Sequence, residues 1–347
     1  MKGGFSGILR SLEDREARKL EQKVPSWGGV RVEVPQAVNF QQCSGETAAR
    51  YKASLIAPGA RVADLTGGLG VDSWAFSAVA SAVWYNERDC VLLQAVQRNF
   101  AALGVSNVVF NSFDIAPDRA DWQEALRAFR PDVIYIDPAR RNAAGNKLFL
   151  LEECSPDVVT LMPTLLAIAP QVMVKVSPMA DLTMLRRRLQ GYLSEIHVVG
   201  VDSECKELLC LCRPNAIFQS LVLFENGFVF REAKAKPNNN DLLFVPSAAL
   251  VKSGLGPGMC LRPYDEGLSH FGGFWEVVEN LPFAASVIKE LGRRYPQADV
   301  TARGVPVSSE GLRAKIRTKP GGPVHIFACV LDGERRILIC KKVSLPE

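Results

Sequence analysis

The sequence predicts an α/β fold in which a Rossmann-like, mostly parallel sheet carries helices on both faces, followed by small C-terminal α+β modules. Three observations predict it. Short apolar segments alternate with amphipathic, helix-like segments between residues 61 and 213. The first apolar strand runs directly into a glycine-rich turn at Gly67, and the alternation ends near Pro214. Strands that alternate with helices form βαβ units, and such units build a parallel sheet that is buried on both sides.

Each element is predicted from its local pattern. Residues 8–23 are rich in Glu, Arg, Lys and Leu at helical spacing and predict an exposed helix, whereas the prolines and glycines of 24–40 favour irregular chain. Ser44 is a good N-cap for a second helix, which ends at Pro58-Gly59. Strands are predicted at 61–65, 82–86, 107–111, 133–136, 171–175, 195–201 and 207–213, and helices at 72–80, 89–103, 121–129, 155–166 and 182–189. The last two strands lack an intervening helix and predict an antiparallel hairpin at the far edge of the sheet.

Beyond Pro214 the pattern is that of smaller modules. A hairpin is predicted around Asn226-Gly227, a favourable turn dipeptide, and a linker follows at 234–241. Helices are then predicted at 286–295 and 308–315, and strands at 324–331 and 336–342. The predicted domains are an N-terminal helical segment at 1–57, the α/β domain at 58–214, a small module or linker at 215–275 and an α+β domain at 276–347.

The composition excludes several classes of protein. The chain is 48% hydrophobic and 22% charged, and it contains no apolar stretch of the ~18 residues that a membrane helix requires. The first residues contain no apolar leader, which favours a cytoplasmic location. Nine scattered cysteines with only three histidines form no paired CxxC motifs, so reduced thiols and no metal site are expected.

The charge is distributed unevenly. The net charge is +4, but residues 283–342 contain twelve Lys or Arg against five Asp or Glu, which leaves the rest of the chain mildly acidic. A basic module favours a polyanionic partner such as RNA, because phosphate contacts supply most non-specific affinity for nucleic acids. A solvated basic surface is the alternative interpretation.

A cofactor crevice is predicted where the first strand meets the glycine-rich turn. Glycines allow a sharp turn and a close approach of the backbone to a ligand. Glu87 ends the next strand, 23 residues after Asp64, at a position that binds ribose hydroxyls in open α/β folds. The candidate cofactor-binding residues of this crevice are Asp64, Thr66, Gly67, Gly68, Gly70, Asp72 and Glu87.

Two cofactors suit such a crevice. A dinucleotide fingerprint requires G-x-G-x-x-G, whereas here Ser73 stands at the third glycine. S-adenosylmethionine (SAM) has an amino group and a positively charged sulfur, which Asp64 and Asp72 would favour and which a pyrophosphate lacks. The charges therefore favour SAM. After the third strand, Phe113 could stack on an adenine ring and Asp114 could accept its amino group; an ordinary surface loop is the alternative.

Catalytic residues are predicted at two later strand ends. The apolar strand 133–136 is followed by Asp137-Pro138-Ala139-Arg140-Arg141, where Asp137 could accept a proton and the arginines could bind phosphate or carboxylate. Lys175 and Ser177 end the next strand, and the Lys175 amine must reach the crevice or a carboxylate. Asp137, Arg140 and Lys175 are the catalytic candidates, and Arg141 and Ser177 are substrate-binding candidates. A structural ion pair between Asp137 and Lys175 is the alternative.

Taken in order, these segments resemble a family of bacterial class I SAM-dependent methyltransferases with C-terminal ferredoxin-like and THUMP-like domains. The resemblance rests on Gln42–Ser44, Ala49–Ala53, Asp64–Asp72, Ile136–Arg141, Lys175–Pro178 and Glu204–Glu207, and on Pro246–Leu250, Val300–Pro306, Leu312–Lys315 and Gly321-Gly322 in the C-terminal part. It implies a SAM-dependent methyltransferase that acts on RNA, with Arg313, Lys315 and Arg317 of the THUMP-like part as further substrate-binding candidates. A metal, a membrane and a defined oligomeric state are not implied.

The sequence also departs from general methyltransferase patterns. Thr66 stands where many such enzymes have the first loop glycine, and Asp137-Pro138-Ala139 lacks the aromatic residue of amino-methylating enzymes. Lys175-Val176-Ser177-Pro178 contains no cysteine nucleophile for covalent chemistry at uracil C5. Four alternatives stay open: a non-catalytic RNA-binding protein with this fold, methylation of a protein, methylation of a small molecule, and an NAD-dependent or nucleotide-sugar oxidoreductase.

Overall fold

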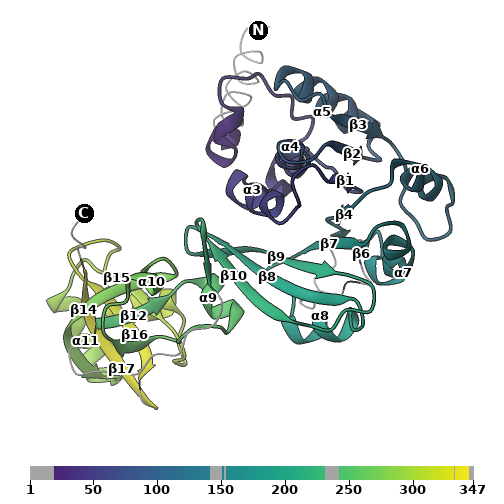
Figure 1. The fold of residues 1–347 in the computed structure, drawn as a ribbon. Coiled ribbons are helices and arrows are strands. Elements are labelled where there is room, and N and C mark those ends of the chain that lie inside the picture. Colours follow the sequence, from purple (N-terminus) through teal and green to yellow (C-terminus); the bar gives the residue numbers. More distant parts are fainter. Residues whose placement is uncertain (1–18, 141–150, 152–153, 231–241, 332, 344–347) are drawn as a thin grey trace, which may run out of the picture. The chain divides into compact units, whose positions relative to one another are not determined.

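A nine-stranded sheet organises the larger part of the chain in the computed structural model, which describes residues 19–140, 151, 154–230, 242–331 and 333–343 (Figure 1). The chain divides into two units. The larger unit comprises Met1–Val201 and Lys206–Gly227, and the smaller comprises Asp202–Cys205 and Phe228–Glu347. Each unit has its own hydrophobic core.

The N-terminal segment contains a helix that was not predicted, and residues 8–18 of the predicted exposed helix lie outside the described residues. Residues 19–23 are helical and are followed by a short 3-10 helix, η1 (Pro25–Trp27), and by α2 (Ala37–Gln42) and α3 (Glu46–Ser54). The prediction of irregular chain at 24–40 was wrong at α2, where the Gln36 backbone N–H donates to Asn39 Oδ1 at the helix start. The predicted N-cap was also wrong: Gly45 precedes α3, because the Ser44 hydroxyl donates to Asp72 instead.

The large sheet follows the predicted alternation of strands and helices. Its strand order is β11-β10-β8-β9-β7-β4-β1-β2-β3. Its strands are β1 (Arg61–Asp64), β2 (Ala82–Asn86), β3 (Val108–Asn111), β4 (Val133–Ile136), β7 (Gln171–Val176), β8 (Leu193–Val201), β9 (Glu204–Cys212), β10 (Ser220–Glu225) and β11 (Phe228–Phe230). The connecting helices are α4 (Val71–Ser77), α5 (Cys90–Ala102), α6 (Asp121–Phe129), α7 (Val158–Ile168) and α8 (Leu182–Arg188). A short pair, β5 (Ala139–Arg140) and β6 (Cys154–Ser155), lies after β4.

The direction of the strands distinguishes this sheet from an all-parallel one. β1 pairs in parallel with β2 and β4, and β4 pairs in parallel with β7, whereas β9 runs antiparallel to β7. The prediction that β8 and β9 form the far edge was wrong, because β10 pairs in parallel with β8 and extends the sheet. The predicted hairpin at Asn226-Gly227 is confirmed between β10 and β11, and both turn residues have the positive φ angles, 48° and 94°, that such a turn requires.

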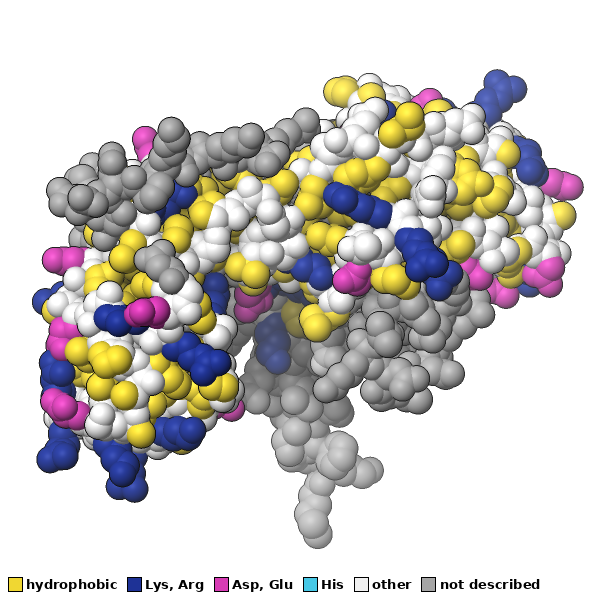
Figure 2. Space-filling model, turned by 90° about the horizontal axis from the view of Figure 1, so that it is seen from below, with side chains coloured by type: hydrophobic (Ala, Val, Ile, Leu, Met, Phe, Trp, Pro, Cys, Tyr) yellow, Lys and Arg dark blue, Asp and Glu magenta, His cyan; other side chains and the backbone are white. Residues whose placement is uncertain are grey.

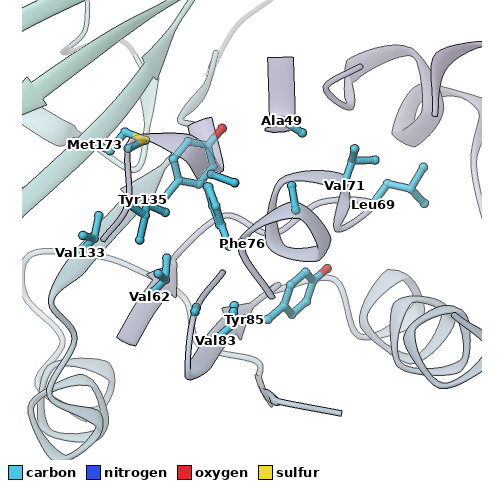
Figure 3. Packing of buried hydrophobic residues seen from close by; sticks show 14 of the residues in the cluster. Ala49, Val62, Leu69, Val71, Phe76, Val83, Tyr85, Val133, Tyr135 and Met173 are labelled. Carbon is cyan, nitrogen blue, oxygen red and sulfur yellow. The ribbon is translucent and has the colours of Figure 1, made fainter. Parts of the chain in front are cut away.

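Both faces of the large sheet are buried. Side chains alternate between the faces along each strand. Val62, Val83 and Tyr135 pack in one cluster with residues from α3, α4 and α5, including Ala49 and Phe76 (Figure 3). The intervening residues Ala63, Trp84 and Ile134 point to the opposite face and are also buried, as are the inward-facing side chains Trp122 and Leu126 of α6 and Leu161 and Leu165 of α7. The predicted Rossmann-like sheet with helices on both faces is therefore confirmed.

The smaller unit is built on a six-stranded sheet of order β13-β12-β14-β17-β16-β15. The strands are β12 (Leu242–Pro246), β13 (Cys260–Arg262), β14 (Gly272–Pro282), β15 (Asp299–Ala302), β16 (His325–Leu331) and β17 (Glu334–Lys342). The helices are α9 (Ala248–Ser253), α10 (Glu266–Ser269), α11 (Ala285–Arg294) and α12 (Ser309–Ile316). Both helices and both strands predicted between 286 and 342 are present. The sheet also contains strands from before residue 275, so it continues across the boundary predicted there.

Helices α11 and α12 cover one face of this second sheet. Leu291 of α11 and Leu312 of α12 are fully buried against Ile326 and Ile339 of the sheet. The two helices approach closely at Gly292, where an added Cβ would overlap the carbonyl oxygen of Ile316. Glycine at this position is therefore required by the helix–helix contact.

Candidate active site

The glycine-rich turn between β1 and α4 is folded around Asp64. Asp64 Oδ1 accepts a hydrogen bond from the Thr66 backbone N–H at 3.0 Å, and Oδ2 accepts one from the Ser73 hydroxyl at 2.6 Å. The side chain is fully buried, and this burial raises the pKa of Asp64 to about 7, although the hydrogen bonds from Ser73 and Thr66 oppose the shift. Asp64 therefore acts within the protein, as the residue that holds the turn.

Each glycine of the turn meets a different requirement. A Cβ at Gly67 would overlap the ring of Tyr85, whose hydroxyl donates to the Gly68 carbonyl oxygen. Gly70 has φ +86° and lies against Phe100 of the core. Gly68 has φ +56°, and an added Cβ there would lie in nearly open space, with Thr66 O at 3.9 Å as the nearest atom. The backbone at Gly68 is therefore accessible to a ligand.

Glu87 joins this turn to the end of β2. Glu87 Oε2 accepts a hydrogen bond from the Gly68 backbone N–H at 3.0 Å, and Oε1 accepts one from the Asp89 N–H at 2.9 Å. The side chain is half-buried. A carboxylate has about four acceptor sites, so two remain for donors such as ribose hydroxyls. This is the geometry expected of the predicted ribose-binding residue.

The loop after β3 is held beside the same strand ends. The amide side chain of Asn86 accepts a hydrogen bond from the Phe113 N–H at 2.7 Å and donates to the carbonyl oxygens of Leu65 and Phe113. The half-buried Phe113 ring lies parallel to Trp84, with ring centroids 6.0 Å apart. Asp114 is exposed and lies 3.9 Å from an Arg119 nitrogen. The structure thus places both predicted adenine-site residues next to the turn, and it adds Asn86, which the sequence reasoning missed.

Asp137 and Lys175 form the central ion pair of the site. Asp137 follows β4, and its backbone N–H donates to the Thr66 hydroxyl at 2.7 Å, which ties it to the glycine-rich turn. Lys175 Nζ lies 2.5 Å from Asp137 Oδ2, and the two side chains are 13% and 35% exposed, respectively. Burial alone would lower the pKa of Lys175, but the charges of Asp137, Glu207 and Asp72 raise it above its usual value. Lys175 is therefore a fixed cation and not a base.

The remaining candidates near Asp137 are placed as follows. Ser177 follows β7, and its Oγ accepts a hydrogen bond from the Met179 backbone N–H at 3.2 Å. Arg140 lies in β5, but its side chain is outside the described part of the structure, as is the whole of Arg141. The predicted roles of these two arginines remain predictions.

Asp72 was expected to face the positive charges of SAM, but its carboxylate is bound inside the protein. Its carboxylate pairs with Lys52 Nζ at 3.0 Å and accepts hydrogen bonds from the hydroxyls of Ser44 and Tyr135, both at 2.8 Å. Burial would raise the pKa of Asp72, but Lys52, Lys175 and the hydrogen bonds lower it below its usual value. Asp72 is thus ionised, but its charge is balanced inside the protein. The carboxylates of Asp64 and Asp72, which favoured SAM in the sequence, are therefore both bound by partners inside the protein.

The basic candidates of the smaller unit lie at the C-terminal end of α12. Arg313 is half-buried and Lys315 is exposed, and Arg317 caps the helix end with φ 65° and is also exposed. Figure 2 shows dark-blue Lys and Arg side chains on the smaller unit, interspersed with magenta Asp and Glu and with apolar side chains. Basic side chains are therefore present on its surface.

The described residues form neither a membrane-spanning helix nor a metal-binding group. No helix in the described part of the chain is long and apolar enough to cross a membrane. Within the same residues, no group of three or more His, Cys, Asp or Glu side chains is arranged to hold a metal ion.

A known structure shows the same architecture over nearly the whole chain. A crystal structure described as a putative methyltransferase from Porphyromonas gingivalis W83 is 27% identical, covers 95% of this chain and 89% of that one, and has a TM-score of 0.80. Residues 272–342 match the family described as THUMP domain-like. No curated protein matches the sequence.

Other solved structures are similar over about half of the chain. A putative methyltransferase from Streptococcus mutans in complex with SAH is 10% identical, covers 52% of this chain and 99% of that one, and has a TM-score of 0.34. A putative tRNA (m1A22) methyltransferase from Streptococcus pneumoniae is 13% identical, covers 50% of this chain and 72% of that one, and has a TM-score of 0.36.

The fold and the geometry of the strand ends define the class of protein. The sheet places an antiparallel strand next to the fifth parallel one, unlike the all-parallel order of dinucleotide-binding domains, and the full-length similarity is to a methyltransferase. The chain is a class I SAM-dependent methyltransferase that carries a THUMP-like domain. The predicted family, fold class and enzyme class are confirmed.

Proposed function

We propose that this methyltransferase transfers the methyl group of SAM to a base in RNA. The observation that carries the proposal is the Asp137–Lys175 pair at the ends of β4 and β7, which the Thr66 hydroxyl joins to the glycine-rich turn. In open α/β sheets, ligands bind beyond the carboxyl ends of the strands, where this pair and the turn meet.

The residues present fit SAM. Glu87 retains acceptor capacity for the ribose hydroxyls, the accessible backbone at Gly68 allows close approach, and Phe113 offers a half-exposed aromatic face for adenine. When bound, SAM supplies a methyl group on a positively charged sulfur, and its transfer leaves the neutral thioether S-adenosylhomocysteine (SAH). We therefore assign the binding and orientation of SAM to four residues, Gly68, Glu87, Phe113 and Asp114.

Asp137 has the part of proton acceptor. Its Oδ2 is bound by Lys175, so Oδ1 is available for the N–H of a nucleophilic base. As the nucleophile bonds to the methyl carbon, the carbon–sulfur bond breaks and its electron pair stays on sulfur. The proton of the nucleophile passes to Asp137, and Lys175 holds the Asp137 carboxylate in place through their ion pair.

The THUMP-like domain supports RNA as the substrate. The segment 283–342 has an excess of seven positive charges, and Lys315 and Arg317 are exposed. Cations on such a surface bind phosphates without reading the sequence, and they supply affinity that falls with added salt.

The test is transfer of labelled methyl groups to bacterial RNA. The full chain is incubated with methyl-labelled SAM and with separated tRNA, rRNA, protein and small-molecule fractions. The wild-type protein is expected to label an RNA fraction, and Asp137→Ala should lower the rate at least about 100-fold, the usual contribution of a positioned proton acceptor. SAH affinity, measured by calorimetry, should stay within a few-fold of wild type.

The matched control is Asp118→Ala, which removes an exposed carboxylate away from the pair and should leave the rate unchanged. Label in the protein or small-molecule fraction in place of RNA would contradict the proposed substrate. An Asp137→Ala variant that loses SAH affinity instead of rate would assign Asp137 to cofactor binding.

A further inference from the structure

A lysine from the N-terminal segment lies fully buried beneath the active site. Lys52 of α3 has no exposed side-chain surface, and its Nζ contacts three oxygens from separate parts of the chain. They are Ser44 Oγ at 2.9 Å, Asp72 Oδ1 at 3.0 Å and Glu207 Oε1 at 2.6 Å. Burying an ion is costly unless its partners are well placed, and here Lys52 donates hydrogen bonds to Ser44 and Glu207 and forms an ion pair with Asp72.

The strand register explains why Lys52 lies on the same face of the sheet as the Asp137–Lys175 pair. Tyr135 and Asp137 share one face of the sheet because side chains alternate along a strand, and Lys175 and Glu207 project from the neighbouring strands to the same face. That face is the one covered by α3, since Tyr135, Met173 and Leu209 pack with Ala49 and Ala53. Lys52 follows Ala49 by three residues, on the same side of the helix, and is fully buried, so it faces the sheet.

The buried charges lie on one face of the sheet. Lys52 pairs with Asp72 and Glu207, and Lys175 pairs with Asp137. The electrostatic influence of both Asp72 and Glu207 reaches Lys175. The titratable groups linked to Lys175 by contact or charge are Cys43, Asp72, Asp137 and Glu207, and Lys52, Asp64 and Tyr135 adjoin Asp72.

We propose that Lys52 is a positioning residue for the methyl transfer. By neutralising Asp72 and Glu207, Lys52 leaves Lys175 committed to Asp137, and one oxygen of Asp137 stays free for the substrate. Without Lys52, two unpaired carboxylates would compete with Asp137 for Lys175. This role rests on the proposed function, but the state of Lys175 can be measured without any substrate.

The test follows the titration of Lys175 by NMR in full-length protein labelled with 13Cε-lysine, with the signal assigned from its loss in Lys175→Arg. Glu207→Gln removes a carboxylate, so the midpoint of Lys175 should fall by about 1 to 3 pH units. Lys52→Met removes a cation and leaves the surroundings of Lys175 more negative, so the midpoint should stay at or above that of wild type. A fall in Glu207→Gln alone is the signature of a charge effect, because loss of packing would lower the midpoint in both variants.

The double variant Lys52→Met/Glu207→Gln guards against a failure to fold. It removes one charge of each sign and restores the balance of charge, so it should be folded and its Lys175 midpoint should return towards that of wild type. Arg50→Met is the matched control, because it removes an exposed cation from the same helix. Its Lys175 midpoint should equal that of wild type.

The outcomes separate this inference from the proposed function. If folded Glu207→Gln protein keeps the wild-type Lys175 midpoint, the buried charges do not control Lys175 and the inference is overturned, whether or not methyl transfer is found. If the midpoints shift as expected but no RNA is labelled, the inference about Lys175 stands and the proposed substrate fails. Where RNA is labelled, Lys52→Met should also lower the rate of methyl transfer, whereas Arg50→Met should not.

Discussion

At the scale of the residue, the acidic side chains of the site serve two different purposes. Asp64 and Asp72 are buried and bound by partners within the protein, whereas Glu87 and Asp137 are half-buried and can accept further hydrogen bonds from a ligand. Asp64, Glu87 and Asp137 end or follow a strand and Asp72 lies in α4, and the sequence predicted that Asp64, Asp72 and Glu87 all contact the cofactor. Burial therefore distinguishes a residue that shapes the site from one that can contact a ligand.

Asp64 predicts a measurable dependence of stability on pH. Its pKa is about 7 in the folded protein, against about 3.9 in an unfolded chain, so the folded state holds the proton more tightly. The contribution is fully present below about pH 4 and is lost as the pH rises through 7, a change of up to about 4 kcal/mol. Asp64→Asn should remove this slope, as measured by urea unfolding between pH 4 and 8.

The control for this measurement is Asp118→Asn, an exposed carboxylate that should leave the slope as it is in wild type. An Asp64→Asn protein with an unchanged slope would mean that Asp64 is already ionised in the folded protein at pH 5.

The sequence predicted those site residues that follow a recognisable local pattern, and it could not predict those that are brought together only by the fold. Glu87, Asp137 and Lys175 were found because each follows an apolar strand whose end points to the crevice. Lys52 and Glu207 stood within the segments that carried the family resemblance, but their roles could not be assigned. Their contact joins residues 155 positions apart. No local sequence pattern shows that a lysine on a short helix and a carboxylate in the interior strand β9 will share one buried space.

At the scale of the element, the turn between β1 and α4 depends on the absence of a side chain at Gly67. Gly67→Ala would place a methyl group in the ring of Tyr85, which is itself fixed in the core. The turn must then move, and overpacking of this kind costs about 1 to 3 kcal/mol. We expect a lower thermal midpoint together with at least a tenfold weaker affinity for SAH in calorimetry.

Gly45→Ala provides the comparison, because a Cβ at Gly45 would make only ordinary contact with Lys23, at 3.6 Å. That variant should bind SAH as wild type does. Equal affinity in both variants would show that the turn does not contact the cofactor.

The elements that were predicted are those with a regular apolar pattern. The buried strands β1, β2, β4 and β7 were found because they are short apolar runs between helices. β14 was missed because its eleven residues alternate between half-buried and exposed positions and include two glycines and two glutamates. Its place in a sheet is fixed by pairing with β12 and β17, which lie far from it in sequence.

At the scale of the whole molecule, two separate cores predict two unfolding events. The cluster around Val62 and Tyr135 belongs to the larger unit, and the cluster around Leu312 and Ile326 belongs to the smaller. If the proposed function is correct, SAH binds only the folded larger unit. At a free SAH concentration of 100 times the Kd, binding would stabilise that unit by about 2.7 kcal/mol. Calorimetry of the full chain should show two transitions, of which SAH raises one.

Leu312→Ala identifies the second transition, because it removes a fully buried side chain from the smaller unit and should lower that transition alone. If SAH raised both transitions equally, the two units would unfold as one.

The contact between Lys52 and Glu207 has a practical consequence for anyone who trims the protein. A fragment that starts at residue 58, where the predicted α/β domain begins, would contain every strand of the nucleotide-binding sheet but neither Ser44 nor Lys52. Asp72 and Glu207 would then be enclosed in the interior without the ammonium that balances them. Expression of the catalytic unit as an independent fragment should therefore keep α3, since the helix supplies a charge that the sheet cannot provide for itself.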